Sequence, residues 1–409
     1  MDTFRSKFVI AGGGMVAGYA AKKLVELGVK EGELAILSAD NSLPYERPPL
    51  SKGFLAGRDT EDAILINGRD FYGSRGIDVR LNCEITGVDP AAKYLTLKSG
   101  ETFGFEKLLL ASGARSRRLK TPGANLEGIR YLRSMDDSKA IGKLAKASKQ
   151  AVVLGGGFIG MEVASVIAQG GSEVTMILSE DRVWQRLFSP EISQFFESYY
   201  AARGVRLIKS AMAAEFRGAS RVESTVLQDG RSIPCDLVVA GIGAEPVTEY
   251  LAGSGIETGN GVIVNEYLET SQPNIFAAGD IANYPDELFG RRRRVEHWDN
   301  AVSQGEHCAR ALLGERAPFR HVPYFFSDVF DLSYEFWGDG DGAGEIVHRG
   351  DLSGNSFSAW WLKDKTVVAA FVMNRPDEER NAASSWIESR QAVSAARLAD
   401  AGRPIGEAL

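Results

Sequence analysis

Apolar residues near the N-terminus follow a strand, helix and strand pattern. The run 8–11 (FVIA) is continuously apolar, which predicts a buried strand, and the run 34–37 (LAIL) predicts another. Between them, apolar residues recur at helical spacing from Ala20 to Leu27, and Gly28 ends this pattern. The order predicts a βαβ unit whose first turn holds three glycines.

A second copy of this pattern begins at residue 151. The run 151–154 (AVVL) predicts a strand, three glycines follow, and a helical pattern continues to a stop at Gly170. The run 174–177 (VTMI) predicts the next strand. Two such units far apart in one chain predict two Rossmann-like dinucleotide-binding domains.

The C-terminal region has a different pattern. From about residue 322, aromatic-rich alternating segments predict an antiparallel sheet, and a polar helix is expected over about 377–399. We therefore predict an α/β protein with two Rossmann-like domains and a C-terminal α+β domain. Arginines 291–294 are the only charge run, and we expect a solvated loop there rather than a docking patch.

Composition narrows the possible functions. The 409 residues include 54 acidic residues against 47 Lys plus Arg, a net charge of −7 that argues against a general nucleic-acid binder. No signal peptide is visible before the first strand, and the apolar stretch 151–172 is interrupted by glycines and Glu162, so we expect a soluble protein without a membrane span.

The three cysteines indicate a reducing compartment. Cys83, Cys235 and Cys308 are isolated, with no C-x-x-C pair and no metal-like spacing to the four histidines. We therefore expect a cytoplasmic protein without a bound metal, and each cysteine as a small buried apolar residue.

The glycines of the first unit match a phosphate-binding fingerprint. Gly12, Gly14 and Ala17 form G-x-G-x-x-A: a tight turn, a close approach for a pyrophosphate, and a small residue for helix packing. Free N–H groups at the helix start, where Met15 and Val16 lie, would face the phosphates. Asp40, at about 20 residues' distance, could accept hydrogen bonds from an adenosine ribose.

The second unit carries the full G-x-G-x-x-G fingerprint. Its glycines are Gly155, Gly157 and Gly160, and they enclose Phe158 and Ile159. Glu180 follows at the distance where an acidic residue favours two free ribose hydroxyls, which predicts NADH rather than NADPH. The nearby Arg182 and Arg186 keep NADPH open as the less favoured alternative.

Several further motifs resemble one family of flavin reductases, which includes monodehydroascorbate reductase and the NADH-dependent ferredoxin or rubredoxin reductases. The resemblance covers nearly the whole chain. Its most specific segments are 44–52 (PYERPPLSK), 111–114 (ASGA), 276–280 (FAAGD), 294–298 (RVEHW) and 323–328 (PYFFSD).

The resemblance implies a glutathione-reductase-like fold with FAD and NADH as cofactors. It implies an FAD-binding domain at 1–112 and 245–321, an NAD-binding domain at 113–244, and the C-terminal domain at 322–409. Asp280 would hydrogen-bond the ribityl chain, and the amides beginning a helix after 296–298 would stabilise negative charge on the reduced flavin. The further implied cofactor contacts are Arg47, Ile85, Arg133, Gly243, Glu296, His297, Trp298 and Phe326.

The same resemblance implies an ion pair between Lys52 and Glu162 beside the flavin and nicotinamide. This pair would set the local charge where hydride arrives, and Glu162 is expected on the first helical turn, where a carboxylate is favourable. Related disulfide reductases pass electrons to a cysteine pair. This chain has no such pair, so reduced flavin must pass electrons to an external acceptor, and glutathione or lipoamide reductase activity is excluded.

The resemblance leaves several acceptors open. Plant-type monodehydroascorbate reductases are expected to use an arginine and a tyrosine near the flavin, and Val302 and Phe326 occupy those positions here. We therefore favour an iron–sulfur acceptor of the ferredoxin or rubredoxin type, with monodehydroascorbate as the alternative. A slowly turning NADH sensor and an NADH oxidase are the remaining possibilities, and the sequence leaves the oligomeric state open.

Overall fold

The computed structural model describes residues 4–409, which form two compact units. The first unit consists of residues 4–47, Thr60–Arg115 and Ala244–Pro323, and the second of Pro48–Asp59, Ser116–Gly243 and Tyr324–Leu409. The predicted boundaries of three domains stay a prediction.

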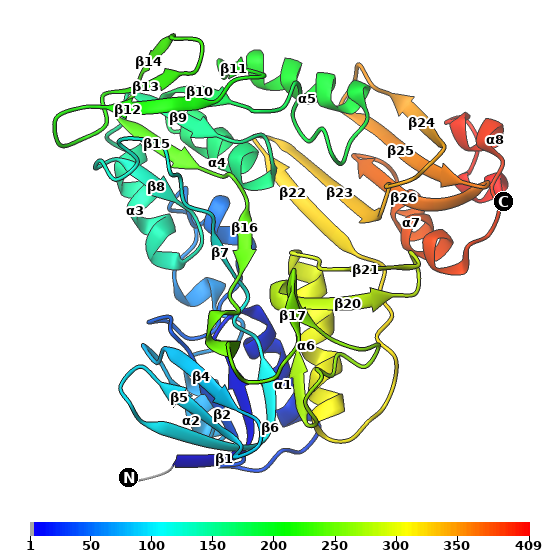
Figure 1. Cartoon of the computed structure of the whole chain (residues 1–409). Coiled ribbons are helices and arrows are strands. Elements are labelled where there is room, and N and C mark those ends of the chain that lie inside the picture. Colours follow the sequence, from blue (N-terminus) through cyan, green and yellow to red (C-terminus); the bar gives the residue numbers. More distant parts are fainter. Residues whose placement is uncertain (1–3) are drawn as a thin grey trace. The chain divides into compact units, whose positions relative to one another are not determined.

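The first unit is built around a mixed seven-stranded sheet in the order β3-β2-β1-β6-β5-β4, with β19 paired to β6 (Figure 1). Pairing is parallel from β3 through β6 to β19 and antiparallel for β4 and β5. The strands are β1 (Phe4–Ala11), β2 (Leu34–Leu37), β3 (Asp78–Arg80), β4 (Ile85–Asp89), β5 (Tyr94–Leu97), β6 (Thr102–Leu110) and β19 (Ile275–Ala277).

The remaining elements of the first unit include a four-stranded sheet in the order β17-β18-β20-β21. Helix α1 packs against α6, and β7 pairs with β16. These elements are α1 (Met15–Glu26), α2 (Asp70–Ser74), α6 (Trp298–Leu312), β7 (Ala114–Ser116), β16 (Ala244–Pro246), β17 (Thr258–Gly259), β18 (Gly261–Ile263), β20 (Ala282–Asp286), β21 (Arg291–Arg293), and the 3₁₀ turns η2 (Asp62–Ile64), η3 (Glu249–Leu251) and η4 (Gly279–Ile281).

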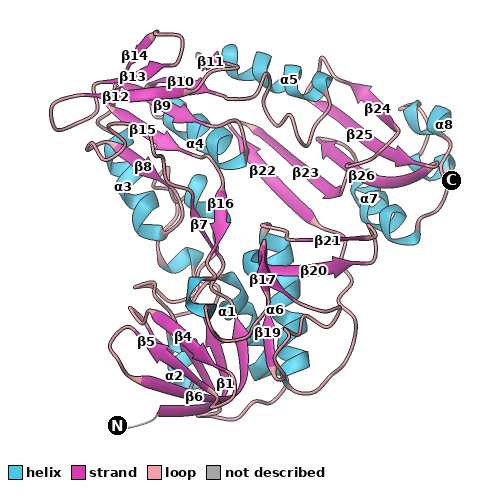
Figure 2. Cartoon of the chain, viewed as in Figure 1, coloured by secondary structure: helices cyan, strands magenta, loops and turns pink. Residues whose placement is uncertain are grey.

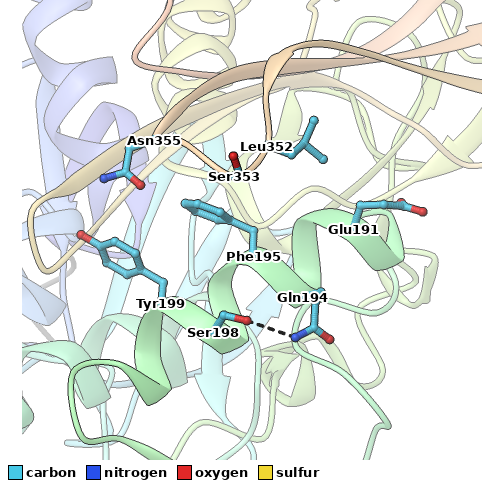
Figure 3. Close-up of a pocket in the computed structure, with 8 residues that line it drawn as sticks. All are labelled: Glu191, Gln194, Phe195, Ser198, Tyr199, Leu352, Ser353 and Asn355. Carbon is cyan, nitrogen blue, oxygen red and sulfur yellow. Dashed lines mark hydrogen bonds between the residues drawn. The ribbon is translucent and has the colours of Figure 1, made fainter.

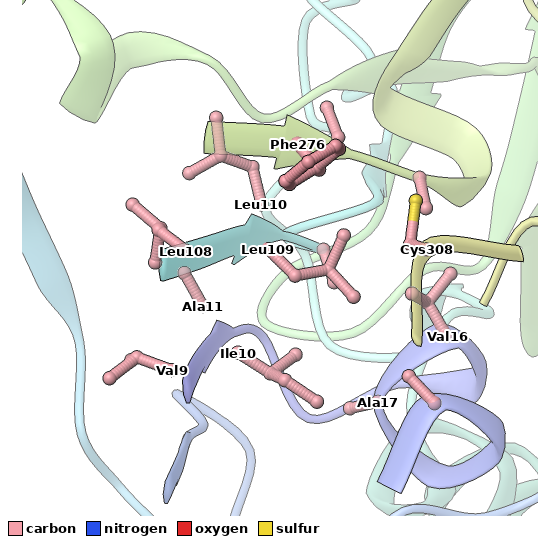
Figure 4. Packing of buried hydrophobic residues seen from close by; sticks show 14 of the residues in the cluster. Val9, Ile10, Ala11, Val16, Ala17, Leu108, Leu109, Leu110, Phe276 and Cys308 are labelled. Atoms are coloured by element: carbon pink, nitrogen blue, oxygen red, sulfur yellow. The ribbon is translucent and has the colours of Figure 1, made fainter. Parts of the chain in front are cut away.

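The core of the first unit explains why its βαβ pattern folds as predicted. Figure 4 shows Val9 and Ile10 of β1, the leucines of β6 and Val16 of α1 gathered around one apolar interior. Parallel strands must be joined by a crossover, and α1 supplies it between β1 and β2 while burying its apolar face. The fingerprint turn is therefore held at the carboxyl end of β1.

The second unit contains a parallel sheet in the order β11-β10-β9-β15-β8 and a small antiparallel sheet β12-β13-β14. Its elements up to Gly243 are η1 (Pro48–Ser51), β8 (Ile129–Tyr131), α3 (Met135–Ala145), β9 (Gln150–Leu154), α4 (Phe158–Gln169), β10 (Glu173–Ile177), α5 (Pro190–Ala201), β11 (Arg206–Ile208), β12 (Ala213–Arg217), β13 (Ser224–Leu227), β14 (Ser232–Pro234) and β15 (Leu237–Ala240).

The C-terminal part of the second unit is the predicted antiparallel sheet, in the order β22-β23-β26-β25-β24 (Figure 2). Helix α7 packs against β26. The elements are β22 (Tyr324–Val329), β23 (Leu332–Gly338), β24 (Glu345–Asp351), β25 (Ser356–Lys363), β26 (Thr366–Met373), α7 (Asp377–Ser389), α8 (Ala395–Ala399) and η5 (Ile405–Ala408).

Two local predictions were wrong. The helix expected over 377–399 is two helices, because Arg390 has a left-handed backbone (φ 52°) that ends α7 at Ser389. Residues 291–294 are not a loop, because 291–293 form β21. Arg291 and Arg292 are exposed, as predicted, but Arg293 makes a 2.6 Å ion pair with the buried Asp286. Buried carbonyl and carboxylate acceptors explain this, because they satisfy guanidinium groups that the charge run alone assigns to solvent.

Candidate functional site

The first fingerprint turn leaves room for a pyrophosphate. Gly12 has φ +131°, and a Cβ there would lie 2.1 Å from the Ala111 carbonyl oxygen, so only glycine fits. A Cβ at Gly14 would meet nothing closer than the Arg47 guanidinium at 3.8 Å. The turn is therefore tight against the sheet at Gly12 and open at Gly14, as an FAD pyrophosphate requires.

Two charged residues expected to contact FAD lie beside this turn. The backbone N–H of Arg47 donates to the Met15 sulfur (3.4 Å), and its guanidinium lies 5.2 Å from the Tyr45 ring centroid. The Tyr45 hydroxyl donates to Asp40 (2.9 Å). Tyr45 thus connects Asp40, the expected ribose contact, to Arg47.

Asp280 lies in η4, which packs on the first helix. The Gly279 N–H donates to Gln304 (2.7 Å), and a Cβ at Gly279 would lie 2.6 Å from Val16, so glycine allows η4 to approach α1. The Arg294 guanidinium donates to the Asp280 carbonyl oxygen (2.8 Å) and pairs with Glu296. Arg294 therefore connects two of the expected flavin contacts.

The start of α6 holds the expected aromatic contacts. His297 is the N-cap residue, α6 begins at Trp298, and the Trp298 indole N–H donates to Glu46 (2.6 Å). The other Glu46 oxygen accepts from the Tyr19 hydroxyl at 2.5 Å. Sequence reasoning did not select Arg294, Glu46 or Gln304, although the first two lie within the quoted motifs.

The second fingerprint has the same division between tight and open glycines. A Cβ at Gly155 (φ +108°) would lie 2.3 Å from the Gly241 carbonyl oxygen, and one at Gly160 would lie 2.1 Å from the Gly155 carbonyl oxygen. A Cβ at Gly157 would have no neighbour within 4 Å, and the same is true at Gly243. The open space at Gly157, at the start of α4, fits a second pyrophosphate.

The two residues inside this fingerprint face different surroundings. The Phe158 ring contacts Phe325 (4.3 Å between centroids) and Trp184, whereas Ile159 is exposed. Phe158 thus anchors α4 within the second unit, and Ile159 leaves an apolar side chain on its surface.

Glu180 and the neighbouring arginines differ in their hydrogen bonds and in their exposure to solvent. Glu180 is half-buried and accepts a hydrogen bond from Ser179 (2.7 Å). Arg182 donates to the Phe188 carbonyl (2.7 Å) and the Ser193 hydroxyl (2.9 Å), so its guanidinium braces the loop before α5. Arg186 is exposed.

Lys52 and Glu162 form the ion pair that the resemblance implies, with Lys52 Nζ 2.5 Å from Glu162 Oε1. The Glu162 side chain is 5% exposed. Contrary to expectation, it does not lie in the first turn of α4, which contains no acidic residue; the helix begins at Phe158, which places Glu162 in the second turn. The position of Glu162 is explained by the hydrogen-bond donors that surround its buried carboxylate, and not by the start of the helix.

Three other side chains complete this cluster. The Lys52 ammonium lies 5.4 Å from the centroid of the Phe326 ring. The buried hydroxyls of Ser51 and Ser327 both donate to the Glu162 carboxylate, the latter at 2.5 Å. Both serines stand inside quoted motifs, but nothing in the sequence distinguished them from other small polar residues.

Comparison with known proteins agrees with this pair of nucleotide-binding turns. The sequence profile of the pyridine nucleotide-disulphide oxidoreductase family matches residues 6–305, and that of the reductase C-terminal domain matches residues 324–409. The chain belongs to the pyridine nucleotide-disulphide oxidoreductase family. It is an oxidoreductase that uses FAD and a pyridine nucleotide, which confirms the predicted fold class and reaction type.

Relatives of this family member include monodehydroascorbate reductases and a ferredoxin reductase. Monodehydroascorbate reductase of Solanum lycopersicum is 36% identical over 97% of each chain. The ferredoxin reductase subunit of the 5,5'-dehydrodivanillate O-demethylase of a Sphingobium species is 38% identical over 98% of this chain and 97% of its own.

Solved structures of the family are similar over the full chain. The ferredoxin reductase for the CYP199A2 system of Rhodopseudomonas palustris has a TM-score of 0.94 at 32% identity, covering 99% of this chain and 100% of its own. The reductase in the covalent putidaredoxin reductase–putidaredoxin complex has a TM-score of 0.94 at 30% identity, covering 98% and 97%.

The remaining expected contacts of this oxidoreductase lie in different places. Ile85 begins β4 and packs half-buried against the core of the first unit, as Val302 of α6 does. In the second unit, the Arg133 backbone N–H donates to Asp137 (3.1 Å), whose side chain also caps α3. These positions leave the predicted cofactor roles of Ile85 and Arg133 as predictions.

The family name refers to disulfide chemistry, but the three cysteines are free and far apart in the sequence. Cys235 and Cys308 are buried, as expected, and burial raises the pKa of each thiol; Cys83 is half-buried. Within residues 4–409, no group of His, Cys, Asp and Glu side chains could hold a metal ion. Across the same residues, no helix is long and apolar enough to span a bilayer.

A hollow of about 610 Å³ lies elsewhere in the second unit (Figure 3). Helix α5 contributes Phe195 and Tyr199, and the turn between β24 and β25 contributes Leu352 and Asn355. None of the residues that line it belongs to the predicted cofactor contacts.

His297 should give the enzyme an acid-sensitive stability. Burial of its ring and the nearby Arg293 guanidinium lower its pKa from 6.5 to about 4. In the unfolded chain His297 binds a proton with the ordinary pKa of about 6.5. Its contribution to the free energy of unfolding is therefore constant above about pH 7 and decreases as the pH falls toward 4. Urea unfolding should therefore show that His297→Gln loses about 2 kcal/mol less stability than the wild type between pH 7 and 5. Equal losses in the two proteins would contradict this account.

Proposed function

We propose that this enzyme passes electrons from NADH, through FAD, to a small iron–sulfur protein of the ferredoxin or rubredoxin type. The observation that carries the choice of acceptor is the Phe326 ring beside the Lys52 ammonium, 5.4 Å away. This ring has no hydroxyl. Val302, at the position where the resemblance implies an arginine for an anionic radical, packs against an apolar core.

The comparisons support the same acceptor class. The Sphingobium relative is a ferredoxin reductase subunit, and the two structures with a TM-score of 0.94 are a ferredoxin reductase and a reductase bound to putidaredoxin. The relatives that are monodehydroascorbate reductases are 35–36% identical, so ascorbyl radical reduction is the second candidate.

Some residues of the chain would bind the cofactor, and others would place a charge beside it. Gly12 and Gly14 shape the pyrophosphate turn, Arg294 fixes the segment that carries Asp280, and Trp298 begins the helix expected at the flavin. Bound FAD would supply the redox chemistry, taking a hydride from nicotinamide and releasing electrons to the acceptor. Lys52 would keep a positive charge near that reaction, held in place by Glu162.

A panel of acceptors tests this proposal. Stopped-flow oxidation of the NADH-reduced enzyme should be fastest with ferredoxin or rubredoxin, and slower with ascorbyl radical, quinone and oxygen. Fastest oxidation by ascorbyl radical would instead establish the monodehydroascorbate reductase activity. A reduced enzyme that persists with every acceptor would indicate an NADH sensor, and peroxide formation with oxygen would indicate an oxidase.

The preference for NADH rests on Glu180 in this proposal. Glu180→Ala should raise the KM for NADH at least about 10-fold, because a charged hydrogen bond to a ribose hydroxyl is worth about 1.5–3 kcal/mol. The KM for NADPH should fall, since the repulsion of its 2′-phosphate is removed. Arg186→Ala is the control for the exposed arginine. If Arg186→Ala raised the KM for NADPH while Glu180→Ala left the KM for NADH unchanged, Arg186 would set the preference and NADPH would be the favoured nucleotide.

We also propose a cytoplasmic location, which the three free and separate cysteines support. Fractionation of cells that express the natural gene would test it. Recovery of the protein with an oxidising compartment would contradict the proposal.

A further inference from the structure

The Glu162 carboxylate is held by donors from two chain segments other than its own. Oε1 accepts from Lys52 and from the Ser327 hydroxyl, and Oε2 accepts from the Ser51 hydroxyl. Ser51 ends η1 and Lys52 follows it, Glu162 belongs to α4, and Ser327 belongs to β22 of the C-terminal sheet. Ser51 and Ser327 are 2% and 0% exposed, so water cannot replace their hydroxyls without rearrangement.

These hydroxyls determine what the carboxylate can do. Each serine has one O–H donor within hydrogen-bond distance of this carboxylate, and the Ser51 hydroxyl also lies 3.4 Å from the Pro48 carbonyl oxygen. Ser51 donates to Oε2, whereas Ser327 and Lys52 both meet Oε1. Donors on both oxygens therefore fix the orientation of the carboxylate that holds the ammonium beside the Phe326 ring.

We propose that Ser51 and Ser327 are positioning residues that hold the Glu162 carboxylate in one orientation, and thereby fix the place of the Lys52 ammonium. This inference rests on the proposed function for its effect on flavin reduction. It also assigns a role to the C-terminal sheet, because Ser327 lies within the residues that match the reductase C-terminal domain.

The other titratable groups near this cluster supply no charge. The Tyr200 hydroxyl donates to the Met161 carbonyl (2.9 Å), and Tyr334 is buried on β23. Burial raises the pKa of both phenols, so both stay neutral through the working range. Asp328 on β22 is exposed. Lys52 is thus the charged group that contacts Glu162, and the two serine hydroxyls are its other donors.

The chain offers a matched control for removing a serine. Ser358 is 0% exposed in the same C-terminal sheet and donates to the buried Glu379 carboxylate at 2.6 Å, which pairs with Arg349 at 2.8 Å. Ser358→Ala therefore removes the same kind of bond from the same kind of carboxylate, at a position without a predicted role in the reaction.

The first test measures flavin reduction by NADH in holoenzyme over a range of NADH concentrations. Ser327→Ala and Ser51→Ala should each lower the limiting rate about 10-fold with little change in the NADH concentration that gives half of it, because the Lys52 ammonium is no longer held in one place while nucleotide binding is untouched. Ser327→Thr, which keeps a hydroxyl, should restore the wild-type rate. Ser358→Ala should leave the rate unchanged. Wild-type limiting rates for both Ser51→Ala and Ser327→Ala would overturn the proposal.

A second measurement does not depend on activity. Thermal unfolding of FAD-free protein should show that Ser327→Ala lowers the midpoint by several degrees in the wild-type background, but by much less in a Glu162→Gln background. Equal shifts in the two backgrounds would overturn the proposal that Ser327 acts on Glu162. If NADH does not reduce the flavin of the wild-type enzyme, the proposed function is contradicted instead. The comparison of unfolding midpoints would still decide whether Ser327 acts on Glu162.

Discussion

Replacing Lys52 by methionine should slow reduction of the flavin by NADH by about 100-fold, the usual effect of removing one preorganised charge from a reaction site. The ammonium lies 2.5 Å from Glu162 and is largely shielded, with a side chain that is 13% exposed. Its field is therefore weakly screened by solvent. The measurement is the single-turnover rate of flavin bleaching, with FAD content determined on the same samples.

Lys209→Met is the matched control for this variant. Lys209 also pairs with a buried glutamate in the second unit, Glu197, at 2.7 Å, but neither residue is a predicted cofactor contact. We expect it to alter stability without slowing flavin reduction. If Lys52→Met retained the wild-type rate with full FAD content, the ion pair would be a structural feature and not part of the reaction site.

Gly12→Ala should cost about 3 kcal/mol of stability or more and give protein without bound flavin. The added methyl group would lie 2.1 Å from the Ala111 carbonyl oxygen, and φ +131° is strained for any residue with a Cβ. The backbone of β6 cannot yield without breaking its pairing with β1. Urea unfolding and the flavin absorbance of the purified protein are the two measurements.

Gly14→Ala separates the phosphate role from the folding role. Gly14 has φ −87°, which alanine adopts without strain, and the methyl group would meet nothing closer than 3.8 Å. We expect normal stability of the FAD-free protein with weaker FAD binding, because the methyl group enters the space left for the pyrophosphate. FAD affinity equal to the wild type would show that the cofactor does not approach this turn.

The sequence was informative wherever a residue type has one physical purpose. Continuous apolar runs predicted β1 and β9, and the glycines between them and their helices predicted turns that the structure shows to be sterically confined at Gly12 and Gly155. Such patterns survive in any context, because a strand buried on both faces needs apolar residues and a φ near +120° needs glycine.

It was less informative wherever partners come from distant segments. The arginines 291–294 look like a solvated charge run until Asp286 and the carbonyl groups of Val264 and Asn283 are placed beside them. The break in the last helix depends on Arg390 adopting a left-handed backbone, which no propensity of arginine suggests.

By itself, the sequence predicted two dinucleotide-binding glycine turns, showed that the chain has no C-x-x-C pair, and predicted the fold class that the family match confirms. Only the tertiary structure decided that Ser51, Lys52 and Ser327 meet on one buried carboxylate. The physical reason is that a fingerprint is a local backbone requirement written in consecutive residues. The state of a buried charge depends instead on donors that folding brings together from 111 and 165 residues away.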